Sequence, residues 1–400
     1  MPASTESTWN RRKAMTGCLA AASGLIPSMV SADSKPIRVG MIASLTGAFA
    51  TNAQAVNFGF QCGIDDLNAQ GGLLGRRLEV TTRDSAADPS KAVNFAKELL
   101  FNERVDVICG PTNSGEVLPT LGIAASAKTL QIVSGSVDEL IDPRKYPLAF
   151  RCLSAASQWY TVSIKFNIET QNRRKIALIT DNSSYGVFAR QRITRLLESY
   201  HINPVYAVSA DISKPDMTDD ILRSRSAGAD SIELWSNSSG FLARTINARG
   251  EQQWNVPIYA QPSAIQSQVA QLLRKKEYLA NVYCAGYRNS VLDEKGNLPP
   301  LTQAFLDRHR NKIGPFMAAG IYAVLQGYNI PLIYAAGVRK CGSVDSTLIA
   351  KAIETLGTIN LPYGPFHFTA TDHTGFPDAG LVMVAADSLH PNGGFKPAAL

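Results

Sequence analysis

Cysteine and histidine are scarce in this 400-residue sequence, which has 6 cysteines and 5 histidines. The cysteines are scattered and no CxxC pair occurs, so we expect neither a disulfide-stapled scaffold nor a zinc site. Cys109 and Cys284 stand in apolar runs, where a free cysteine behaves as a small hydrophobic residue. The five histidines stand in polar or turn contexts, and we expect them at the surface. We therefore predict no bound metal ion and no cofactor.

Runs of one charge are also absent. The chain has 39 Lys plus Arg and 33 Asp plus Glu, a net charge of +6. A nucleic-acid-binding protein gathers its basic residues on one face or arm, so we expect no nucleic-acid partner. The composition is 45% hydrophobic and 18% charged, which is typical of folded globular proteins. A chain of this length favours two domains.

The common catalytic motifs do not occur either. We find no GxSxG, no GxGxxG after a strand, no GxxxxGK[ST] and no HExxH. The glycine-rich segment 71–75 follows a helical pattern, so we interpret it as the end of a helix and a turn. The sequence therefore does not predict an enzyme, although an enzyme stays open as a hypothesis.

The N-terminus has the order of features that export requires. Arg11, Arg12 and Lys13 precede a stretch of small and apolar residues at 14–30. Small residues follow at 30–32, where a signal peptidase cleaves. We predict a signal peptide at residues 1–32, cleaved near Ala32, and a periplasmic location. A buried N-terminal helix is the alternative, and the paired arginines leave both the general secretory and the twin-arginine route open.

Short apolar segments alternate with helical patterns along the rest of the chain. Residues 37–43 predict a strand, and apolar residues at helical spacing over 56–67 follow it. Asp88 precedes Pro89, as expected of an N-cap and the first residue of a helix. Such alternation indicates an α/β fold with parallel sheets covered on both faces. Further strands are expected at 78–83, 105–109, 131–133, 175–180, 205–210, 231–235 and 257–260.

One segment, residues 316–337, is apolar enough to resemble a membrane span. Gln326, Asn329 and Pro331 interrupt it, so we interpret it as a buried helix. The mature protein is therefore not expected to span a membrane.

Small hydroxyl residues follow two of the predicted strands, in segments 108–115 and 133–136. In open α/β sheets, ligands bind beyond the carboxyl ends of the strands, where helix N-termini present free N–H groups. Serine hydroxyls and such amides suit a carboxylate or a carbonyl group. The same serines can equally cap helices and form turns.

These motifs, in their order, resemble the periplasmic solute-binding proteins of the leucine/isoleucine/valine type, the receptors of branched-chain amino-acid ABC importers. The resemblance covers nearly all of residues 36–390. Any one motif is weak evidence, but the series follows the family's order after an export signal. The segments that carry it are 42–47, 64–75, 84–89, 110–115, 136–140, 181–186, 363–368 and 372–375.

The resemblance implies two Rossmann-like α/β lobes with a ligand cleft between them and three hinge crossings. The first lobe would comprise 33–153 and 287–374, and the second 154–286 and 375–400. It also implies a small-molecule ligand and an inner-membrane ABC permease as partners. A ligand sensor built on the same fold is the alternative function.

The resemblance further implies ligand-binding residues in both lobes. Asn52 of the first lobe would touch the ligand side chain, and Tyr185 of the second lobe would close over it. Trp235 or Asn237 would touch the ligand from the end of a second-lobe strand. The hydroxyl groups expected to hold a ligand carboxylate are those of Ser114, Ser134 and Ser136.

The sequence departs from the family at residues 259–263. Amino-acid binders of this type hold the ligand's ammonium group with an acid here, whereas this chain has Gln261 and no Asp or Glu. A buried ammonium group without a negative partner costs several kcal/mol. We therefore expect a carboxylate without an ammonium group, or an amide, at least as readily as an amino acid. Phe49 is a further candidate for the apolar end of the ligand.

Overall fold

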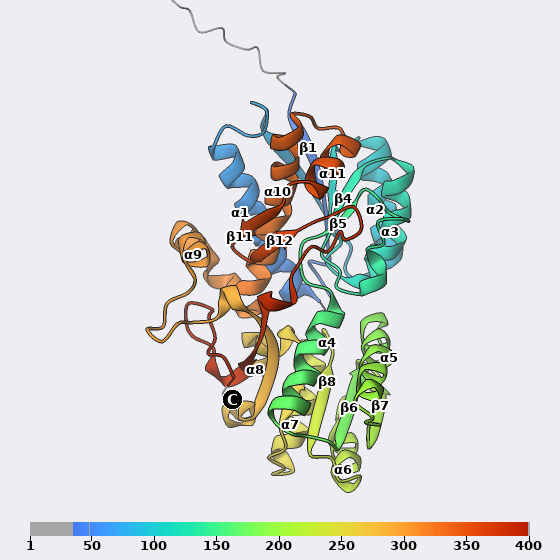
Figure 1. Cartoon of the computed structure of the whole chain (residues 1–400), viewed down its shortest axis with the longest axis vertical. Helices are drawn as coiled ribbons and strands as arrows, with labels where there is room; N and C mark the ends of the chain where they lie inside the picture. The colour runs from blue at the N-terminus through green and yellow to red at the C-terminus, as the bar shows by residue number, and fades with distance from the viewer. Residues whose placement is uncertain (1–34, 48, 399–400) are drawn as a thin grey trace, which may run out of the picture.

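The computed structural model describes residues 35–47 and 49–398, which form two α/β lobes stacked one above the other in Figure 1. Each lobe has a sheet that is wholly or mainly parallel and is covered by helices, so the predicted fold class is confirmed. The predicted signal peptide at 1–32 lies outside the described residues.

The first lobe is built on a five-stranded parallel sheet of order β2-β1-β3-β4-β5. Helices α1, α2 and α3 connect its strands in the usual crossover manner. The strands are β1 (Ile37–Ala43), β2 (Leu78–Asp84), β3 (Val107–Cys109), β4 (Leu130–Val133) and β5 (Ala149–Arg151), and the helices are α1 (Ala50–Ala69), α2 (Pro89–Lys97) and α3 (Ser114–Ser126).

The second lobe is built on a six-stranded sheet of order β13-β10-β9-β8-β6-β7, in which only β13 is antiparallel. The parallel part repeats the strand order of the first lobe. Its strands are β6 (Ile176–Asp181), β7 (Tyr206–Ala210), β8 (Ser231–Trp235), β9 (Ile258–Ala260), β10 (Val282–Tyr287) and β13 (Leu381–Ala385), and its helices are α4 (Ala156–Lys165), α5 (Ser184–Ser199), α6 (Thr218–Ser226), α7 (Ser239–Glu251) and α8 (Ser267–Leu272).

The chain passes between the lobes three times, as predicted. It crosses between β5 and α4, after β10, and between a hairpin of the first lobe and β13. The predicted residue limits of the lobes stay a prediction. The elements between the second and third crossings are α9 (Pro300–Ile313), α10 (Ile321–Cys341), α11 (Ser346–Glu354), β11 (Thr358–Leu361) and β12 (Gly364–His367).

Helix α10 packs against α1 at very short range. A Cβ atom added to Gly59 would lie 1.8 Å from the carbonyl oxygen of Val324, and one added to Gly327 would lie 1.8 Å from that of Val56. Within the described part of the chain, α10 is the one helix long and apolar enough to cross a membrane, and 89% of its most apolar window is buried in the fold. The interpretation of this apolar segment as a buried helix is confirmed, although the helix begins only at residue 321.

Two local predictions, the cap of α2 and the buried cysteines, are confirmed by the side chains. Asp88 caps α2, where its carboxylate accepts hydrogen bonds from the backbone N–H of Ser90 at 2.7 Å and of Lys91 at 3.3 Å. Cys109 and Cys284 are buried free thiols in the sheets. No group of residues able to hold a metal ion occurs in ranges 35–47 and 49–398.

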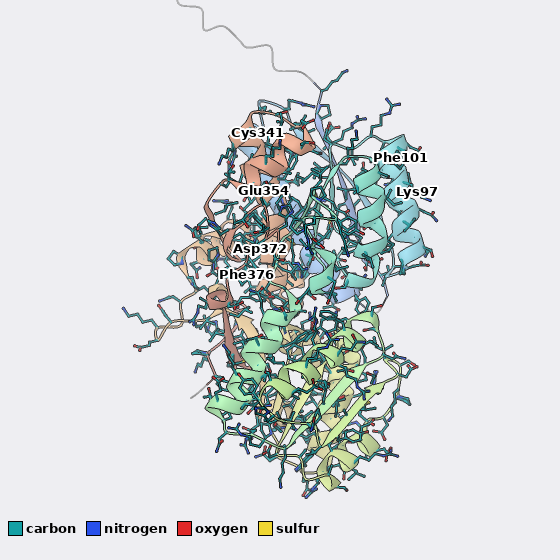
Figure 2. The ribbon with its side chains drawn as sticks, turned by 45° about the vertical axis from the view of Figure 1, so that its right-hand side comes forward. Lys97, Phe101, Cys341, Glu354, Asp372 and Phe376 are labelled. Atoms are coloured by element: carbon teal, nitrogen blue, oxygen red, sulfur yellow. The ribbon has the colours of Figure 1, made fainter. Side chains whose placement is uncertain are left out.

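The prediction that all histidines lie at the surface is wrong for His309 and His373, which are buried. The His373 ring stacks on Phe150 with centroids 4.0 Å apart, and its Nε2 lies 3.1 Å from Glu354 Oε1. Burial is tolerated because both ring nitrogens have partners, the second being the carbonyl oxygen of Ala149. His373 thereby anchors the third crossing to the end of α11, and along this crossing Asp372 and then Phe376 lie progressively nearer the second lobe (Figure 2).

We predict that Gly327→Ala destabilises the protein by about 2 kcal/mol or more, because the added methyl group overlaps the α1 backbone. Urea unfolding followed by circular dichroism measures the change. Gly122→Ala is the matched control, since a Cβ in this exposed helical position meets nothing within 4 Å and is expected to stabilise α3 by about 0.5–1 kcal/mol. Equal stabilities for wild type and Gly327→Ala would contradict the close packing.

Candidate functional site

A cavity of about 60 Å³ lies between the lobes, where loops that follow the strands of both sheets meet. In each sheet the strand order reverses between the first and third strands of that lobe, which is where α/β proteins bind ligands. Residues from both lobes line the cavity, so it is a cleft site. Six of the eight predicted ligand-binding residues line it, together with Phe49: Asn52, Ser114, Ser134, Ser136, Asn237 and Gln261.

The first lobe presents a group of serine hydroxyls to the cavity. The Ser114 hydroxyl oxygen accepts hydrogen bonds from the backbone N–H of Ser136 at 3.2 Å and of Val137 at 3.3 Å. Because its oxygen accepts twice, its own hydrogen is free to donate elsewhere. The Ser136 hydroxyl has no partner within the part of the chain that the structure describes, and the Ser134 oxygen accepts from the amide of Gln326.

The start of α3 adds backbone donors on the same side. Asn113 caps this helix, with its side-chain oxygen accepting from the N–H of Glu116 at 3.3 Å, and Ser114 is the first helical residue. The N-terminus of a helix favours negative charge because its first N–H groups lack partners within the helix. The hydroxyl groups and the helix N-terminus together can donate hydrogen bonds to a carboxylate or carbonyl group of a solute.

The second lobe presents side-chain amides. Gln261 Nε2 donates to Asn237 Oδ1 at 2.8 Å and to the carbonyl oxygen of Ser236. Gln266 Nε2 bridges the lobes, because it lies 3.2 Å from the Tyr322 hydroxyl and 3.4 Å from Asn52 Oδ1. These contacts hold the two walls of the cleft close together.

The remaining wall is aromatic, and most of its residues were not predicted from the sequence. Trp159 Nε1 donates to the Tyr287 hydroxyl at 3.0 Å, and the Tyr287 and Tyr322 rings stack with centroids 5.6 Å apart. All three rings line the cavity. Gln326, a polar residue within the apolar segment 316–337, was the one sequence signal that α10 reaches a polar site.

Tyr185 and Trp235 are not among the residues that line the cavity. Trp235 is fully buried in the second lobe, where its Nε1 donates to Glu233 at 2.9 Å and its ring meets Tyr160 edge to face. Tyr185 is buried beside Tyr160 at the start of α5. The interior gives the indole N–H an acceptor and gives both rings apolar contacts. The strand-end position alone therefore does not bring either side chain to the cleft.

None of the described residues that line the cavity carries a charge. Nearby acids are engaged below its surface: Glu116 accepts from the Ser44 hydroxyl at 2.7 Å, and Asp181 accepts from the N–H of Ser183 at 2.9 Å. Burial raises the pKa of Glu116 above its ordinary value. The cleft therefore offers hydrogen bonds and flat apolar surface, without a negative partner for a cation.

The sequence matches the family model described as periplasmic binding protein over residues 36–388, nearly the whole chain. The chain belongs to the periplasmic binding protein family. It is of the leucine/isoleucine/valine-binding type I kind, a solute-binding and non-enzymatic fold, so the predicted resemblance and the absence of enzymatic activity in this family are confirmed. Membership also supports a periplasmic location for this binding protein.

Curated relatives of this periplasmic binding protein are distant. It is 24% identical over 358 residues to the leucine-, isoleucine-, valine-, threonine- and alanine-binding protein of Pseudomonas aeruginosa, covering 87% of this chain and 89% of that one. It is 26% identical to a Leu/Ile/Val-binding protein of Rhizobium johnstonii over 174 residues, 44% of this chain, and there it spans only 46% of the relative's length.

Solved structures agree on the fold. A branched-chain amino-acid binding protein of Streptococcus pneumoniae, in complex with isoleucine, superimposes with a TM-score of 0.77 at 20% identity over 91% of this chain and 99% of that chain. A solute-binding protein of an ABC transporter from R. palustris, in complex with 4-hydroxybenzoate, gives 0.76 at 16% identity over 92% and 96%. At these identities the likeness shows the fold alone.

Glu233 lies inside the second lobe of this binding protein and generates a prediction about pH. Burial raises its pKa from an ordinary 4.5 to about 7, although Asn167, Trp235 and Ser163 donate hydrogen bonds to it. The unfolded chain releases this proton at lower pH than the folded one, so the free energy of unfolding falls as pH rises from about 4.5 to 7, by about 3 kcal/mol in all.

In Glu233→Gln this part of the pH dependence should disappear, because an amide does not titrate. Chemical unfolding of wild type and variant at several pH values from 4.5 to 8 measures it. The same slope in both proteins would show that Glu233 does not titrate in this range.

Proposed function

We propose that this protein captures a small carboxylate or amide solute between its lobes and delivers it to an ABC permease. The observation that carries the proposal is the uncharged cleft with serine hydroxyls at one end and aromatic rings at the other. Hydroxyl groups and helix N-terminal amides bind carboxylate or carbonyl oxygens well.

The lack of an acid in the cleft argues against an amino acid as the preferred ligand. An ammonium group taken from water into this cavity would meet only neutral oxygens, at a cost of several kcal/mol. Gln261 stands where the family resemblance implies an acid, and its Nε2 is already occupied by Asn237. A solute without an ammonium group avoids this cost.

The aromatic wall fits a flat or branched apolar group. Trp159, Tyr287 and Tyr322 offer ring faces and edges near the hinge, and Phe49 offers another from the first lobe. Proteins with the same fold were solved with isoleucine and with 4-hydroxybenzoate, so the fold accommodates an amino acid as well as an aromatic acid. For this chain, the uncharged cavity favours an acid without an ammonium group, such as an aromatic acid, over an amino acid.

We predict that Ser136→Ala weakens carboxylate binding about ten- to hundredfold, because one hydroxyl donor to a charged group contributes about 1.5–3 kcal/mol. Titration calorimetry with 4-methylpentanoate, 3-phenylpropanoate, leucine and phenylalanine measures affinity and ligand class together. Ser126→Ala, an exposed serine on α3, is the control and should bind like wild type.

Tight binding of leucine or phenylalanine with negligible binding of the two deaminated acids would overturn the proposed ligand class. Unchanged affinity in Ser136→Ala, with the protein folded, would remove Ser136 from the site.

Lobe closure gives a separate prediction. Arg192 of α5 pairs with Glu139 of the first lobe, and the Thr51 hydroxyl lies 2.5 Å from Gln268 Oε1 of α8. These contacts exist only when the lobes are close. Saturating ligand should therefore lower the radius of gyration in small-angle X-ray scattering.

Arg192→Glu should weaken the binding of every ligand severalfold and to the same extent, because the new carboxylate would face that of Glu139 across the cleft in the closed state. The matched control is Arg223→Glu, which reverses one charge of the pair with Asp219 inside α6. No compaction with a ligand that calorimetry shows to be bound would contradict closure.

A further inference from the structure

A buried arginine lies behind the serine cluster without a negative partner. Arg151, the last residue of β5, is fully buried. Its guanidinium donates to three consecutive carbonyl oxygens, those of Ser136 at 2.5 Å, Val137 at 2.7 Å and Asp138 at 3.3 Å. Across ranges 35–47 and 49–398 it forms no ion pair with a carboxylate within 4 Å, and its Nε has no hydrogen-bond partner.

The same loop connects this arginine to the cavity. The peptide group between Ser136 and Val137 accepts from Arg151 at its carbonyl oxygen and donates to the Ser114 hydroxyl oxygen at its N–H. A cation at the carbonyl end strengthens the N–H as a donor, because bonds in a chain polarise one another in a medium of low dielectric constant. Ser114 in turn has its hydrogen free to donate in another direction.

A buried positive charge lies on this side of the cavity, and Asp138, Asp372 and Glu139 oppose it without pairing with it directly. Desolvation lowers the pKa of Arg151 to about 10, so the guanidinium stays charged at neutral pH. Asp138 is the acid with the largest effect on it, and the Asp138 carboxylate is half-exposed and accepts a hydrogen bond from the N–H of Ser157 at 3.1 Å. No described residue lining the cavity carries a compensating charge.

We propose that Arg151 is a positioning residue whose buried positive charge makes the cleft select carboxylate anions over the neutral amides of the same shape. The inference rests on the proposed function and narrows its ligand class. Arg151 does not touch the ligand; it acts through the loop at 136–138, which it holds from behind, and through its charge, which a neighbouring anion would balance.

The test compares 3-phenylpropanoate with its primary amide, 3-phenylpropanamide, by calorimetry. These two differ in charge and hardly in shape, so a merely structural role of Arg151 would alter both affinities equally. Wild type should bind the acid at least about tenfold more tightly than the amide. Arg151→Gln should bring the affinities for acid and amide to about the same value. Arg151→Lys should keep most of the preference for the acid because the charge is preserved.

Asp138→Asn gives a second test that leaves Arg151 in place. The asparagine oxygen keeps the hydrogen bond from Ser157, while the loss of the acid leaves the guanidinium less compensated. The acid should bind about threefold more tightly and the amide as before. The control, Asp307→Asn, removes an acid that pairs with Arg310 on α9 and should change neither affinity.

Equal affinity of wild type for acid and amide would overturn the inference while leaving the proposed function standing. If Arg151→Gln does not fold, Asp138→Asn decides: an unchanged ratio of acid to amide affinity overturns the inference. Binding of neither compound, with tight binding of free amino acids, would overturn both proposals together.

Discussion

The approach of α1 to α10 through Gly59 and Gly327 is the constraint on which the rest of the structure depends. The helices touch backbone to backbone, so no side chain larger than hydrogen fits at either position. This contact fixes where α10 stands relative to the first sheet. Tyr322 and Gln326, on one face of α10, consequently reach the cleft, where Gln326 bonds Ser134. A packing requirement deep in one lobe thus sets part of the geometry of the proposed ligand site.

The two lobes share a strand order but contribute different chemistry. The first lobe contributes the serine hydroxyls and the start of α3, the second contributes Asn237 and Gln261, and aromatic rings come from both lobes. The acids of both lobes are kept below the surface by hydrogen bonds from neighbours such as Ser44 and Ser183. Burial of these acids leaves the cavity neutral at its surface, and the charge of Arg151, only partly offset by Asp138, lies behind it.

Much of this architecture was predictable, because it is encoded locally. Asp88 before Pro89 predicts the start of α2, and the serines at the ends of β3 and β4 lie at the cleft because parallel strands end at one edge of a sheet. The motifs of the family resemblance predicted the two-lobed fold and its three crossings.

What escaped prediction depends on long-range packing. Trp235 ends a strand beside the cleft, but its indole N–H finds an acceptor in Glu233 and the ring stays in the core. Trp159 and Tyr287 line the cavity because two crossings of the chain run side by side there, which no local pattern reveals. His373 is buried because both of its ring nitrogens have hydrogen-bond partners that are distant in sequence, the carbonyl oxygen of Ala149 and the carboxylate of Glu354.

The antiparallel strand β13 has a consequence for the order in which the protein assembles. It pairs with β10 from a position far along the chain, after the whole of α9 to β12 has returned to the first lobe. Until residues 381–385 have been synthesised, the outer edge of β10 presents unpaired N–H and C=O groups. Pairing of such sequence-distant strands is slow, because the intervening loop must close first. The second lobe is thus the later of the two to be completed, because its sheet waits for a strand near the end of the chain.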